Sequence, residues 1–231
     1  VLPLRTMVLT ALTLTEKTGG AAYGETALPV DEKIESMFPQ LKAGNKPTIV
    51  WLCDVSDDKI LKKIDGTIMK NEGVGIAMQR FNTFRVNVLD MPDGELKDKY
   101  MKRLPAFHFY DPAAKPLKAI AGKRAASLSM FTKLMEATWN QSFVMTLKDF
   151  QKGMKDVLDG LDKYEVKKQV VDKKRERLEE KPNRGVQRQV DAEQAKLDEM
   201  RKEIEEQEKA LVDKCALRPD FLPEAAGEES R

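Results

Sequence analysis

Three short apolar runs organise the first part of the chain. They lie at 48–53, 84–89 and 106–110, and each carries few charged residues. Runs of this kind are typical of strands that are buried on both faces. Helical spacing separates the first two runs, where the glycine-containing segment 71–75 is interpreted as a break. A return strand at 116–121 and a final helix complete the succession βαβαββα, which predicts an α/β domain.

After about Leu147 the apolar residues recur at a different spacing, one every seven positions. This spacing is typical of helices that pack along a narrow seam. Between two such arms, the segment 181–185 contains a proline, which stops a helix, and a glycine, which permits a tight turn. We therefore predict an antiparallel coiled-coil hairpin whose first arm is about 50 Å long at ~1.5 Å per residue. The seam residues are Phe150, Val157, Tyr164, Val171 and Leu178, then Val190, Leu197, Ile204 and Leu211.

Several seam positions of the predicted hairpin are polar. Lys168, Arg175, Glu193 and Gln207 fall where a coiled coil prefers apolar residues. Two arms with this many polar seam positions form a marginal pair, which indicates a further partner helix or a second copy of the chain. A self-contained, solvated hairpin is the alternative.

The overall charge does not indicate which class of partner the chain binds, because 40 basic residues nearly cancel 38 acidic ones and the net charge is +2. Nucleic-acid binding needs a basic face. Basic clusters such as 173–175 are followed by acidic ones, so we interpret them as pairs between residues four apart rather than as an RNA or membrane patch. No run reaches the roughly 18 to 20 continuous apolar residues of a membrane span.

Few residues could carry catalytic or metal chemistry. The chain has one histidine, His108, and two cysteines, Cys53 and Cys215, which lie far apart in the sequence. They form neither a CxxC pair nor a metal-ligand cluster. A triad or a histidine-rich metal site would depend on His108 alone. We interpret His108 as a structural strand residue, and we expect no metal or cofactor.

Two segments carry a family resemblance. The run 86–90 is a strand ending in an acidic residue, and 99–106 places a tyrosine, a basic residue and an aliphatic before Pro105. With the hairpin and helix that follow, their order resembles the thioredoxin family from roughly Ile34 to Asn140. The resemblance implies a three-layer α/β/α domain and a cis bond at Pro105. It also implies a peptide groove at Leu104, Pro105 and Ala106, although Pro105 as plain fold architecture is the alternative.

The chain departs from this family at its redox motif. Thioredoxins carry CxxC after the first central strand, where a helix N-terminus favours the thiolate. Here Cys53 has no cysteine three positions on, and Ser56 stands nearest the attacking thiol. A serine there cannot form a disulfide, and nearby carboxylates oppose thiolate formation. The degenerate position is Ser56, Asp57, Asp58 and Lys59, with Cys53 as the one candidate thiol.

The composition changes divide the chain into four parts: an N-terminal arm (1–27), a thioredoxin-like domain (28–140), a helical hairpin (141–215) and a flexible tail (216–231). The arm has one early arginine, a short apolar stretch and small residues, so an export signal or its remnant and an irregular or strand-like arm both stay open. An exported, organellar or cytoplasmic location therefore stays open too.

The leading hypothesis is a non-catalytic, thioredoxin-like interaction or scaffold protein whose hairpin engages a protein partner, an assembly or a second copy. Two alternatives remain. One is a thiol-dependent redox protein that uses Cys53, with Cys215 as resolving thiol. The other is a chaperone-like peptide binder that uses the groove beside Pro105.

Overall fold

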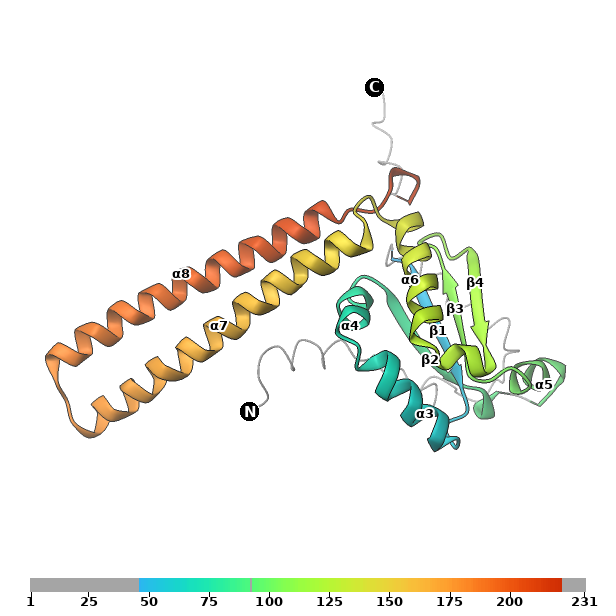
Figure 1. The fold of residues 1–231 in the computed structure, drawn as a ribbon, viewed down its shortest axis with the longest axis horizontal. Coiled ribbons are helices and arrows are strands. Elements are labelled where there is room, and N and C mark those ends of the chain that lie inside the picture. Colours follow the sequence, from blue (N-terminus) through green and yellow to red (C-terminus); the bar gives the residue numbers. More distant parts are fainter. Residues whose placement is uncertain (1–45, 92, 222–231) are drawn as a thin grey trace, which may run out of the picture. The chain divides into compact units, whose positions relative to one another are not determined.

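The computed structural model describes residues 46–91 and 93–221, which separate into two compact units (Figure 1). Within these ranges, Lys148–Cys215 form one unit, and the residues before and after them form the other. The predicted arm, 1–27, lies outside the described residues, as do residues 28–45 of the predicted domain and 222–231 of the predicted tail.

The α/β unit contains a four-stranded mixed sheet in the order β2-β1-β3-β4. The strands are β1 (Thr48–Cys53), β2 (Asn82–Asn87), β3 (Ala106–Tyr110) and β4 (Pro116–Ala121). β1 pairs parallel with β2 and antiparallel with β3, and β3 pairs antiparallel with β4. All six residues of β1 are buried, because it is a central strand covered on both faces. The prediction of an α/β fold is confirmed.

The second strand lies two residues earlier than the predicted 84–89. β2 ends at Asn87, and Val88 and Leu89 belong to a short 3-10 helix, η2 (Val88–Asp90). The Asn87 side chain accepts a hydrogen bond from the Leu89 backbone N–H at 3.3 Å, which turns the chain out of the sheet. Val88 is buried although it lies beyond the strand, so the apolar run does not mark where the strand ends.

The predicted helix break occurs at Asn71, but it does not extend over the predicted 71–75. β1 is followed by α3 (Asp58–Ile64), a π-helical segment η1 (Asp65–Met69) and α4 (Glu72–Met78). Gly73 and Gly75 lie inside α4, which begins after Asn71. The Asn71 side chain accepts a hydrogen bond from the Val74 N–H at 3.1 Å and caps the helix. This cap and the burial of the helix's apolar residues outweigh the low helix propensity of glycine.

Helices contact both faces of the sheet. The later ones are α5 (Glu95–Met101), η3 (Gly122–Ala126) and α6 (Leu128–Ser142). On one face, Phe131 of α6 packs on Phe107 of β3 with ring centroids 4.9 Å apart. On the other face, Tyr100 of α5 packs edge-on against His108 at 6.2 Å. His108 is half-buried in β3, consistent with the structural interpretation.

The second unit is built from two long helices, α7 (Leu147–Glu180) and α8 (Arg184–Lys214) (Figure 1). The turn between them lies within the predicted 181–185. Lys174 contacts Glu193 and Lys167 contacts Met200, so later residues of α8 meet earlier residues of α7 and the helices are antiparallel. No helix among the described residues is both long and apolar enough to cross a membrane.

The first residues of the predicted flexible tail, directly after α8, form backbone hydrogen bonds with residues 142–144. Leu217 forms an antiparallel bridge with Phe143, and the Arg218 N–H donates to the Ser142 carbonyl at 2.9 Å. The Val144 N–H donates to the Ala216 carbonyl at 3.0 Å. These bonds join the segment that precedes the hairpin to the segment that follows it, which an exposed and polar tail sequence does not reveal.

Candidate functional site

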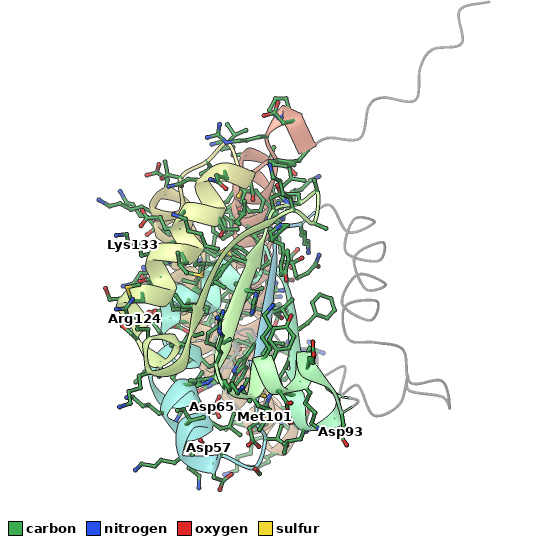
Figure 2. The ribbon with its side chains drawn as sticks, turned by 90° about the vertical axis from the view of Figure 1, so that its right-hand side faces the viewer. Asp57, Asp65, Asp93, Met101, Arg124 and Lys133 are labelled. Carbon is green, nitrogen blue, oxygen red and sulfur yellow. The ribbon has the colours of Figure 1, made fainter. Side chains whose placement is uncertain are left out.

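The predicted position of the missing redox motif lies at one end of the sheet. β1 and β2 both end there, and β3 begins there, because Leu52 pairs with Ala106. The loop after Cys53 and the Leu104–Pro105 peptide therefore lie at the same end, which we call the motif end. The Leu104–Pro105 bond is cis, as the resemblance implied. Figure 2 labels Asp57 and Met101 toward this end of the unit.

Cys53 is the last residue of β1, and its side chain is fully buried. Burial raises the pKa of the thiol, and the nearby Arg85 only partly opposes this effect. The Arg85 Nε–H donates to Cys53 Sγ at 3.4 Å, and its guanidinium carbon lies 4.7 Å from the centroid of the Trp51 ring. A buried thiol with a raised pKa is a poor nucleophile, because the thiolate is the attacking form. Cys215 is also buried, and neither cysteine is in a disulfide.

The residues of the degenerate motif form the turn into α3 and lie exposed. The Ser56 hydroxyl donates to Asp54 Oδ1 at 2.6 Å, and its backbone N–H donates to the same oxygen at 2.8 Å. The Ser56 hydroxyl, then its backbone N–H, lower the pKa of Asp54. Asp57 caps α3 by accepting from the Ile60 N–H at 3.1 Å. The polar side chains therefore shape a turn.

Asp58 and Lys59, the other two residues of the degenerate position, belong to the first turn of α3. Asp58 pairs with Lys62 at 3.1 Å, and both side chains are 78% exposed. A pair this exposed contributes little to stability. The exposed Lys59 extends the same solvated helix surface.

His108 cannot serve as a base for Cys53, because the two residues occupy opposite faces of the sheet. Trp51 pairs with Phe107, which places both on one face. Cys53 lies two residues after Trp51 and shares that face, whereas His108 follows Phe107 and points the other way. Burial lowers the pKa of His108, which favours its neutral form. Since the chain has one histidine, no cysteine–histidine pair forms at the motif end.

Sequence reasoning missed an apolar surface at the motif end, formed by Val55 and Leu89, which we call the edge patch. These side chains are 44% and 39% exposed. Asn87 joins their loops, because its Oδ1 accepts from the backbone N–H of each residue at 3.3 Å. Met101, 37% exposed, is also labelled at this end in Figure 2. The signal available in the sequence was Asn87, because an asparagine at the end of a strand often forms hydrogen bonds that turn the chain.

The predicted groove residues lie together at the start of β3, but most of their side-chain surface is buried in the α/β unit. Pro105 and Ala106 are buried, and Leu104 is half-buried against the core beneath α5. The Gly122 N–H donates to the Pro105 carbonyl at 2.8 Å and to the Arg103 carbonyl at 3.0 Å. A peptide groove beside Pro105 remains a prediction.

Among the described residues, no group of three or more histidine, cysteine, aspartate or glutamate side chains could hold a metal ion. At the motif end, Asp54 accepts hydrogen bonds within a turn and Asp57 caps α3. Their geometry is that of a folded loop rather than of a ligand set.

Most residues of the predicted seam are buried. Phe150, Val157 and Ile204 are buried, and Leu211 is half-buried. The remaining five seam residues form one cluster in the distal half: Val171, Leu178, Val190 and Leu197 are buried, and Tyr164 is partly buried against them. The description of this pair as a coiled coil remains a prediction.

Two glycines of α7 that sequence reasoning overlooked lie close to α8. A Cβ added to Gly153 would lie 2.8 Å from Leu211 Cδ1, and one added to Gly160 would lie 3.3 Å from Ile204 Cγ1. The residues seven and fourteen positions beyond Gly160 are Lys167 and Lys174. Glycine lets the helices approach closely, whereas lysine reaches along the surface to the facing helix.

No protein-family model matches the chain, and neither does any curated protein sequence. Among solved structures, the chain is similar to a thioredoxin from Thermus thermophilus, studied in solution, with 17% sequence identity and a TM-score of 0.34. The match covers 48% of this chain and 87% of that one. A likeness this weak adds nothing to the strand order and burial described above.

Proposed function

We propose that this chain is a non-catalytic interaction protein, in which an α/β unit of thioredoxin-like architecture carries a helical hairpin that binds a partner protein. The observation that carries the proposal is the small number of buried apolar residues in the distal half of the hairpin. The two helices have 34 and 31 residues, and burial between them is uneven. Phe150, Val157 and Ile204 are buried in the half that contains the start of α7, whereas the distal half has a cluster of four buried residues. Exposed valines lie beside this cluster, at Val166 and Val170. A helix pair whose distal half buries little apolar surface gains stability when a partner covers that half.

The absence of usable redox chemistry supports the non-catalytic part of the proposal. Cys53 is buried with a raised pKa, and His108 lies on the opposite face of the sheet. Ser56 donates its hydroxyl to Asp54 within a turn. None of these side chains is both exposed and activated.

A second candidate function is peptide binding at the motif end. The edge patch, Val55 and Leu89, favours it, because exposed apolar side chains beside an irregular loop are typical of a docking surface. The two candidates place the partner on different units of the chain.

Site-specific photocrosslinking in the source cells separates them. A photoreactive phenylalanine replaces Val166 in one variant of the full chain and Val55 in another. Both positions are exposed, so neither replacement disturbs the core. The hairpin proposal predicts one stoichiometric crosslinked species from position 166 and none from 55. Many species from 55 alone would favour peptide binding, and rapid dithiol turnover that disappears in Cys53→Ser would refute the non-catalytic assignment.

A further inference from the structure

The distal half of α7 carries basic and apolar side chains on one face. Residues three, four and seven apart share a face of a helix, which groups Lys163, Val166, Lys167, Val170 and Lys174. Val166 is 65% exposed and Val170 is 49% exposed. From Lys163 to Lys174 the face extends about 17 Å at ~1.5 Å per residue.

Contacts with α8 show on which side of the hairpin this face lies. Lys174 Nζ bonds to the Glu193 carboxylate at 2.6 and 2.8 Å, and Lys167 Nζ approaches Met200 Sδ at 4.0 Å. Lys196 lies three residues after Glu193 and four before Met200, so it belongs to the same side. We call the surface of Lys163, Val166, Lys167, Val170, Lys174 and Lys196 the basic face.

The two sides of the hairpin differ in how many of their basic side chains form ion pairs. On the side where Arg201 lies 5.8 Å from the Tyr164 ring centroid, Arg201 pairs with Glu205. Lys168 of α7 likewise pairs with Asp172 at 2.6 Å. On the basic face, by contrast, Lys163, Lys167 and Lys196 form no ion pair within the part of the chain that the structure describes. These three lysines therefore keep charges that no described carboxylate contacts, although Glu199 and Glu203 lie on the same side of α8.

We propose that the basic face binds an acidic, amphipathic α-helix of a partner protein. This inference rests on the proposed function and names the surface and the chemistry of the partner. Apolar residues of such a helix would cover Val166 and Val170, and its carboxylates would meet the lysines on either side. Charge complementarity selects this occupant, because covering the valines brings the partner's flanks within reach of Lys163 and Lys167.

Other occupants fit the basic face less well. A second copy placed by two-fold symmetry would bring the same lysines against each other. A membrane surface calls for large apolar residues such as Trp, Phe and Leu, whereas this face offers two valines. Nucleic acid would gain from the lysines but would leave the valines exposed.

The test uses the full chain and a designed helical peptide of about three heptads with leucine at the seam and glutamate on the flanks. A peptide of the same pattern with lysine on the flanks is the matched probe. Binding is measured by calorimetry at low salt and at about 0.5 M salt, where surface charges are screened. The proposal predicts binding of the acidic peptide alone, and weaker binding at high salt. Equal binding of both peptides, or binding of neither, overturns it.

Two double variants locate the binding. Lys163→Glu with Lys167→Glu reverses the charge, and Val166→Ser with Val170→Ser removes the apolar contact. Each is expected to weaken binding by about tenfold or more, because the first replaces attraction by repulsion at two positions and the second removes the apolar contact. Lys202→Glu with Lys209→Glu changes the net charge equally on α8 outside the basic face and should change binding less than threefold. An equal loss in this control overturns the proposal, and far-UV circular dichroism verifies that all variants are folded.

Three further outcomes contradict the proposal. They are tighter binding of a DNA duplex, tighter binding of anionic vesicles, and a salt-sensitive dimer that the Lys163→Glu and Lys167→Glu variant abolishes. The in-cell crosslink at position 166 keeps the two proposals apart. If the crosslink survives charge reversal, the basic-face inference fails while the proposed function stands. If position 166 never crosslinks, the proposed function fails.

Discussion

Substituting two valines of the hairpin with alanine should have effects of opposite sign on its stability. Val190 is completely buried in the seam cluster, whereas Val166 is 65% exposed. Val190→Ala removes two methyl groups from the core, which costs about 2 kcal/mol including the cavity that remains. Alanine regains about 0.5 kcal/mol through its higher helix propensity at either position. The net change is therefore a loss of about 1.5 kcal/mol for Val190→Ala and a gain of about 0.5 kcal/mol for Val166→Ala.

Amide hydrogen exchange is the appropriate measurement, because the chain has two compact units and one global unfolding transition is not assured. Exchange of α8 amides in the native protein reports the opening free energy of the hairpin. Faster α8 exchange is expected in Val190→Ala and slower exchange in Val166→Ala, with β1 amides unchanged in both. The reasoning fails if Val190→Ala stays within about 0.5 kcal/mol of the parent protein, or if Val166→Ala loses more than about 1 kcal/mol.

Three other substitutions test the motif end. Burial raises the pKa of Cys53, so its contribution to stability is present below the pKa of the unfolded thiol and is lost as the pH rises through the higher folded value. Cys53→Ser should therefore flatten the fall in urea stability at about pH 8 to 10, and an unchanged slope would contradict this. Ser56→Ala removes the main cause of the lowered pKa of Asp54, which should rise toward 3.8 in an NMR titration; a constant pKa would show that the hydroxyl is not the cause. Asn87→Ala loses two hydrogen bonds and should cost about 1 kcal/mol in urea unfolding, with faster exchange in both loops of the edge patch, whereas unchanged exchange would argue against the link.

The sequence predicted the elements with strong local signals. The uncharged run at 48–53 is a buried strand, and the turn at 181–185 separates two long helices. Each signal depends on a few neighbouring residues: an apolar run, or a proline with a glycine. Such signals failed where tertiary packing outweighed them, as at Gly73 and Gly75 inside α4.

The sequence by itself determined that the chain lacks a CxxC pair and has one histidine, because these are matters of residue identity. Only the tertiary structure decided that Cys53 and His108 face opposite ways, since that depends on the register in which β1 pairs with β3. Which lysines of the hairpin form an ion pair among the described residues was likewise undetermined by composition. It follows from how α7 pairs with α8, which places Lys167 and Lys174 beside Met200 and Glu193. The sequence states which residues are present, but the packing of elements that are distant in sequence determines which residues become neighbours.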